Sequence, residues 1–135
     1  KLLNPSEAKI FTQLCCCIWD LEEAHFGREK VLIKDMDSNG RYSDETWGFN
    51  GSFISHLEEV GLVYDSFLQL DSKRTYNATF FGKVHKLKTN LKEKQIDIVA
   101  LTQVGVEIFN IVNPKSNNNY YKRTLEYFEK INILK

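Results

Sequence analysis

The segment ALTQVGVEIFNIV, residues 100–112, limits the fold more than any other part of the chain. The residues before it, 95–101, alternate between apolar and polar side chains, which is typical of a half-buried strand. Thr102 is a natural N-cap, and the Asn113-Pro114 pair predicts the end of the helix that follows. The pattern therefore predicts a strand that passes into a helix through one capping residue.

Gly105 lies in the first turn of this predicted helix, in the middle of its apolar stripe. Glycine inside a helix costs roughly 1 kcal/mol relative to alanine. We expect it here because another backbone or a large side chain approaches the helix closely. On this interpretation, the change Gly105→Ala destabilises the fold although alanine is the better helix former.

The same patterns predict the remaining elements. Asn4, Pro5 and Glu7 form a helix start with a capping box, and that helix is expected to end near His25 or Gly27. Gly61 suits a left-handed stop after a second helix. The further expected elements are strands at 30–35, 62–70, 75–87 (with a bulge near Phe81-Gly82) and 95–101, and helices at 50–59 and 119–130.

Several phrases along the chain resemble a known type of domain. They are NPSEAKIFTQL near the start, LEEVGLV at 57–63, ALTQVGVEI at 100–108, and the closing helix with its tyrosines. Together they resemble the C-terminal domain of an uncharacterised bacterial protein family, and the order of elements resembles a winged helix. The resemblance implies a fold and a modular position. It implies no assigned activity and provides no catalytic residues to carry over.

The expected fold is therefore α+β, a winged-helix-like domain with about four helices and a three-stranded antiparallel β-sheet or wing. Its 135 residues suit a single domain spanning 1–135. Because the chain starts at Lys1 and a helix follows almost at once, we expect it to be a piece of a longer protein.

The charge and the cysteine content restrict the partners and the cellular compartment that we expect for this chain. Lys plus Arg and Asp plus Glu number 18 each, so no global field draws the chain to nucleic acid or to a membrane. The longest apolar run, LCCCIW, is far too short to span a bilayer, and no signal peptide is visible. The three cysteines are consecutive, at 15–17, which excludes a distant intrachain disulfide and favours the cytoplasm.

DNA binding is the alternative that the winged-helix expectation raises. The helix expected to read bases, 50–61, contains no Lys or Arg and carries Glu58 and Glu59. The expected wing is basic and could contact phosphates. The competing interpretation is a solvated loop whose lysines protect strand edges, and we prefer it. The candidate nucleic-acid residues are Lys83, Lys86, Lys88, Lys92 and Lys94.

The stretch DMDSNGRYSDET, residues 35–46, begins like a calcium-binding loop. Its candidate ligands are Asp35, Asp37, Asn39 and Ser43. The twelfth position is Thr46, where a calcium loop normally has a bidentate glutamate. The flanking residues do not predict two helices either, so a polar turn is the preferred interpretation.

No pattern in the chain predicts catalysis or a cofactor. Three adjacent helical cysteines point about 100° apart and cannot converge on one metal ion. We expect Cys15 in the core, Cys17 at its flank and Cys16 as the more exposed. The sequence thus predicts a noncatalytic interaction module of a bacterial cytosolic protein, without a cofactor, whose partner is another protein or the rest of the parent chain. Thr102, Gly105 and Gly61 are expected to have structural roles.

Overall fold

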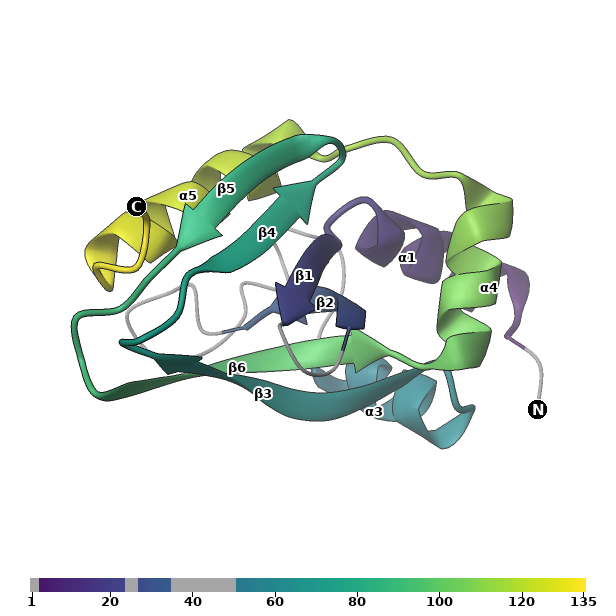
Figure 1. Cartoon of the computed structure of the whole chain (residues 1–135). Helices are drawn as coiled ribbons and strands as arrows, with labels where there is room; N and C mark the ends of the chain where they lie inside the picture. Colours follow the sequence, from purple (N-terminus) through teal and green to yellow (C-terminus); the bar gives the residue numbers. More distant parts are fainter. Residues whose placement is uncertain (1–2, 24–26, 35–50) are drawn as a thin grey trace.

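The computed structural model describes residues 3–23, 27–34 and 51–135 of the chain (Figure 1). The described part forms helices and strands in the order α1 (Pro5–Cys15), β1 (Trp19–Glu23), β2 (Gly27–Ile33), α3 (Gly51–Glu59), β3 (Val63–Asp71), β4 (Tyr76–Phe80), β5 (Lys83–Leu87), β6 (Glu93–Leu101), α4 (Gln103–Val112) and α5 (Asn118–Lys130). None of the described helices is long and apolar enough to cross a membrane.

The strands form one six-stranded antiparallel sheet in the order β3-β6-β2-β1-β4-β5. The expected winged helix with a three-stranded sheet or wing is therefore wrong, although the α+β class is right. In the observed sheet, β1 and β2 lie in the centre and join β6 to β4. The segments expected to form a wing are thus parts of one continuous sheet.

The largest single error concerns residues 19–23, which were expected to continue the first helix. That helix ends at Cys15, and β1 follows with Trp19 and Leu21 buried on one face. Ile18 and Leu21 fit a helical spacing as well as the end of a strand, so periodicity could not separate the two. Pairing with β2 and β4 on both sides decides for the strand.

A tight turn replaces the bulge expected within residues 75–87. Phe80 pairs with Lys83, and the two residues between them have positive φ angles, 49° at Phe81 and 87° at Gly82. Positive φ at both central positions is the requirement of a type I′ turn, one of the two turns favoured in two-residue hairpin loops. The interruption of the apolar–polar alternation near Phe81-Gly82 therefore marks a hairpin turn, which divides the single expected strand into β4 and β5.

The core on one face of the sheet is covered by α5, which lies along β4 and β5 in Figure 1. The Trp19 ring is fully buried there and packs against Phe80 and Phe128, with centroid distances of 5.1 and 5.4 Å. The buried hydroxyl of Tyr120 accepts a hydrogen bond of 2.9 Å from the Ile33 backbone N–H. These contacts fix α5 to the centre of the sheet.

The junction between β6 and α4 is built around the start of β3. The Thr102 hydroxyl caps α4 by accepting from Gly105 N–H at 3.1 Å, and it donates to the Gly61 carbonyl at 2.6 Å. Gly61 has φ of 82°, a left-handed conformation after α3. A β-carbon added to Gly105 would overlap the carbonyl oxygen of Leu62. The close neighbour expected at Gly105 is therefore a backbone carbonyl.

Candidate functional site

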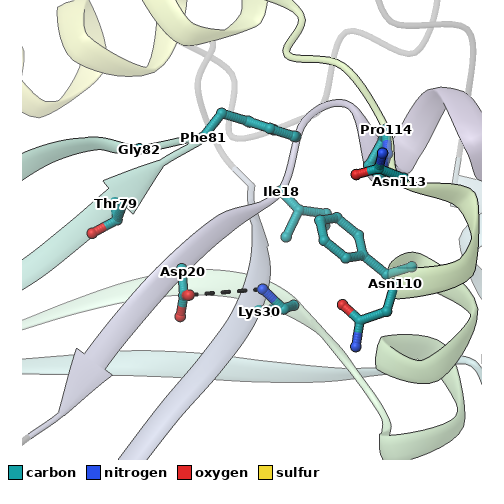
Figure 2. Close-up of a pocket in the computed structure, with 10 residues that line it drawn as sticks. Ile18, Asp20, Lys30, Thr79, Phe81, Gly82, Asn110, Asn113 and Pro114 are labelled. Carbon is teal, nitrogen blue, oxygen red and sulfur yellow. Dashed lines mark ion pairs between the residues drawn. The ribbon is translucent and has the colours of Figure 1, made fainter.

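A pocket of about 280 Å³ lies on the sheet face opposite the α5 core, at the C-terminal end of α4. Strand alternation places Asp20, Lys30 and Thr79 on this face, since Trp19 and Leu21 point into the core. Figure 2 shows the Lys30 ammonium directed toward Asp20, with Thr79 on one side of this pair and Asn110, on α4, on the other. The remaining lining residues are Ile18, Phe81, Gly82, Phe109, Asn113 and Pro114.

An ion pair lies on the floor of this pocket. The Lys30 ammonium is 3.7 Å from an Asp20 carboxylate oxygen, and each side chain is 25% exposed. The same ammonium lies 4.7 Å from the centroid of the Phe109 ring, which is a cation–π contact. The pocket thus combines a charge pair, a hydroxyl, side-chain amides and aromatic carbon.

A second candidate surface is the outer edge of β3, which is an edge strand of the sheet formed by the described residues. Lys34 N–H donates to the Asp97 carbonyl, so the backbone N–H and C=O groups of Asp97 point toward β2. The backbone groups of the adjacent residues in β6 therefore point toward β3. Alternation along β3 then turns the backbone polar groups of Asp65, Phe67 and Gln69 away from β6. No hydrogen bond to these outward backbone groups occurs within the described parts of the chain. The Phe67 side chain is 55% exposed beside them.

The five lysines proposed for nucleic-acid contact do not share one face. Lys83 and Lys86 lie on opposite faces of β5, because they are three positions apart in a strand whose side chains alternate between faces. The Lys83 ammonium lies 4.6 Å from the Tyr121 ring centroid, and Lys88 donates to the Ser72 carbonyl at 3.0 Å. Lys92 follows in the turn after β5, and Lys94 lies within β6.

Within the described residues no three His, Cys, Asp or Glu side chains are grouped as a metal site. The calcium-loop candidates Asp35, Asp37, Asn39 and Ser43 lie outside the described residues. The helix expected to read bases corresponds to α3 (Gly51–Glu59).

The expected positions of Cys15 and Cys16 are confirmed, whereas Cys17, expected at the flank of the core, lies within it. Cys15 and Cys17 are fully buried, and Cys16 is partly exposed. Burial raises the pKa of Cys15 to about 12, and it also raises the pKa of Cys17. The thiolate is the reactive form of cysteine, so these two thiols are poor nucleophiles at neutral pH.

His85 is the described histidine closest to the aromatic core. Its Nε2 lies 2.5 Å from the Tyr121 hydroxyl, and its ring is 6.0 Å from the Trp19 ring centroid. Desolvation and then the nearby Lys83 charge lower the pKa of His85. The neutral imidazole is therefore favoured, with one nitrogen engaged by the tyrosine.

Sequence reasoning did not identify the pocket or the β3 edge. Residues 19–23 were expected to be helical, so the pairing of Asp20 with Lys30 across two strands could not be foreseen. The other residues that line the pocket come from the hairpin turn at Phe81 and from the C-terminal end of α4, over 25 residues later in the sequence. These segments come together only through the order of the strands in the sheet, and no local sequence pattern predicts that order.

A family model described as "Protein of unknown function (DUF2806)" matches residues 1–125. No curated protein and no solved structure matches the chain.

Proposed function

Because the chain belongs to the DUF2806 family of proteins of unknown function, we propose a function from its geometry: a noncatalytic interaction module that binds an extended protein segment along β3. The observation that carries this proposal is the outward row of backbone groups at Asp65, Phe67 and Gln69. A strand edge with unpaired N–H and C=O groups is a template for a further strand.

The side chains of β3 support the same role. Phe67 is 55% exposed and Tyr64 is 42% exposed, and both are large apolar side chains on an edge strand of nine residues. Monomeric proteins usually protect such edges with charges, prolines or short strands. The added segment would come from another protein or from the rest of the parent chain.

The noncatalytic part of the proposal is supported by the cysteines and by His85. The two buried thiols have raised pKa values, and the imidazole has a lowered one with Tyr121 at hydrogen-bond distance. These groups pack within the protein and are not arranged as a nucleophile and its base.

A photo-crosslinking residue at Phe67 in the full-length protein, expressed in its native host, tests the β3 proposal. The matched control places the crosslinker at Val84, which is 62% exposed on the opposite edge strand β5. We expect an adduct that forms from position 67 and not from position 84. Mass spectrometry of the adduct then identifies the crosslinked segment as a second protein, a second copy or another part of the same chain.

A proline substitution makes this experiment specific for strand addition. Gln69→Pro removes an outward N–H and leaves the pairing with β6 intact, whereas Ser66→Pro removes an N–H that faces β6. Gln69→Pro should therefore keep the fold and abolish the adduct. An adduct that survives Gln69→Pro, or that forms equally from position 84, would contradict the proposal.

DNA contact through Lys83, Lys86, Lys88, Lys92 and Lys94 is the alternative. The separation of Lys83 and Lys86 onto opposite faces of β5 weighs against a single phosphate-binding surface. Fluorescence anisotropy with duplex DNA at low salt distinguishes the two functions. Salt-sensitive binding with a dissociation constant below about 1 μM would favour DNA.

A further inference from the structure

We propose that the pocket between β1, β2, β4 and the C-terminal end of α4 binds a neutral carbohydrate ring. The pocket is separate from the β3 edge, because its strand residues lie on β2, β1 and β4, and β6 lies between β3 and β2. Its volume of about 280 Å³ is near the lower end of ligand pockets and suits one sugar unit.

The charges in the pocket favour a neutral ligand. The Asp20 carboxylate and the Lys30 ammonium are 3.7 Å apart and cancel as formal charges. The C-terminal end of α4 adds the negative end of the helix dipole, which disfavours phosphates and carboxylates. A ligand cation is disfavoured too, because the Lys30 ammonium already lies over the Phe109 ring.

The hydrogen-bonding groups favour a ligand that both donates and accepts. Lys30 makes two contacts within the described part of the chain, the pair with Asp20 and the contact with the Phe109 ring. Neither is a hydrogen bond, since 3.7 Å exceeds the usual N–H···O range. Its donors therefore have capacity for a ligand oxygen. Thr79, Asn110 and Asn113 each supply both a donor and an acceptor around the same space.

The aromatic side chains distinguish a sugar from a flat base. The Phe81 and Phe109 rings are 6.4 Å apart and inclined at 40°, so they do not form a parallel slot for a nucleobase. A pyranose presents C–H groups on its face and hydroxyls at its rim. Its C–H groups can lie against the Phe81 ring while its hydroxyls reach Lys30 and Asn110, which both line the pocket.

The experiment is a saturation-transfer NMR titration of the whole chain with methyl pyranosides of glucose, galactose, mannose and N-acetylglucosamine. We expect at least one to bind with a dissociation constant on the order of 1 mM, as is reasonable for a small neutral ligand. Adenosine and glucose 6-phosphate serve as comparison ligands. A preference for either of them over every neutral pyranoside would overturn the proposal, as would no pyranoside signal at about 20 mM.

Two variants locate the binding. Asn110→Ala removes an exposed pocket amide, and Glu107→Ala changes an exposed residue of the same helix that does not line the pocket. We expect Asn110→Ala to weaken binding about tenfold, equivalent to the loss of one hydrogen bond to the ligand, and Glu107→Ala to leave it unchanged. Equal affinities for the wild type and Asn110→Ala would place the sugar elsewhere and overturn the assignment. Phe81→Leu provides a second, apolar test of the same pocket.

Discussion

The carbonyl oxygen of Leu62 occupies the space that a β-carbon on Gly105 would fill. This oxygen cannot move away easily. It accepts a hydrogen bond of 3.0 Å from Thr102 N–H, and the preceding Gly61 carbonyl is bonded to the Thr102 hydroxyl. The start of β3 and the first turn of α4 are thus held together by backbone groups, and glycine is the residue that allows the approach.

Gly105→Ala should therefore destabilise the protein. Alanine gains roughly 1 kcal/mol of helix propensity, but relieving the overlap requires the α4 backbone or the β3 entry to shift. We expect a net loss of about 1–3 kcal/mol, measured as the free energy of unfolding in urea. Glu107→Ala, at an exposed position of the same helix, should change it by less than about 0.5 kcal/mol. A Gly105→Ala variant as stable as the wild type would show that the Leu62 carbonyl yields without cost.

Thr102 should contribute to the stability of the fold through both of the hydrogen bonds that its hydroxyl makes. Thr102→Ala removes the N-cap acceptor for Gly105 N–H and the donor to the Gly61 carbonyl. The expected loss is about 1–2 kcal/mol, the upper part of the range for N-cap substitutions. Thr102→Ser keeps the hydroxyl and should retain most of this stability in the same urea experiment. If serine were as damaging as alanine, packing of the threonine methyl would be the main contribution.

Parts of the fold with strong local signals could be predicted from the sequence. The capping box was expected, and the structure has both of its bonds, from Glu7 N–H to Asn4 Oδ1 at 2.8 Å and from Asn4 N–H to Glu7 Oε1 at 2.9 Å. The helices α4 and α5 and the strands β3 and β6 also lie within a few residues of their expected bounds. Each of these elements carries a cap or a clear period of its own.

The rest of the fold depends on pairing between distant segments. β1 became a strand because β2 and β4 satisfy its backbone on both sides, which residues 19–23 cannot indicate alone. The phase slip at Phe81-Gly82 was visible, but the φ angles that distinguish a bulge from a hairpin turn were not. The ion pair between Asp20 and Lys30 follows from the register of β1 and β2. Because residues 19–23 were expected to be helical, the pocket that contains this pair could not be predicted either.

The Tyr120 hydroxyl should contribute more to the stability of the fold than the hydroxyl of its neighbour Tyr121. Tyr120 is 1% exposed, accepts from Ile33 N–H at 2.9 Å and donates to the Ile33 carbonyl at 3.3 Å. Tyr120→Phe leaves these buried backbone groups without that partner, at a cost of about 1–3 kcal/mol. Tyr121→Phe removes a half-buried hydroxyl next to His85, where water can substitute, and should cost less. Thermal melting of the two variants side by side checks the order, and a reversed order would contradict the role assigned to Tyr120.

The buried thiols predict a loss of stability in alkaline solution. Burial raises the pKa of Cys15 from 9.0 to about 12, with the neighbouring Cys16 as a further cause. Between these two values the unfolded chain has lost the proton that the folded chain keeps, so stability falls as the pH rises. The contribution is complete below pH 9.0 and is lost through the interval up to about pH 12.

Comparison of the wild type with Cys15→Ala isolates this effect from other alkaline titrations. The alanine variant should be less stable at pH 7, because the core loses a side-chain atom. Its free energy of unfolding should nevertheless decline less steeply above pH 9.0, by up to about 1.4 kcal/mol per pH unit, the limit for one proton. Urea unfolding at intervals from pH 7 to about pH 10.5 measures both slopes. Parallel slopes for the two proteins would mean that Cys15 ionises in the folded state as readily as in the unfolded chain.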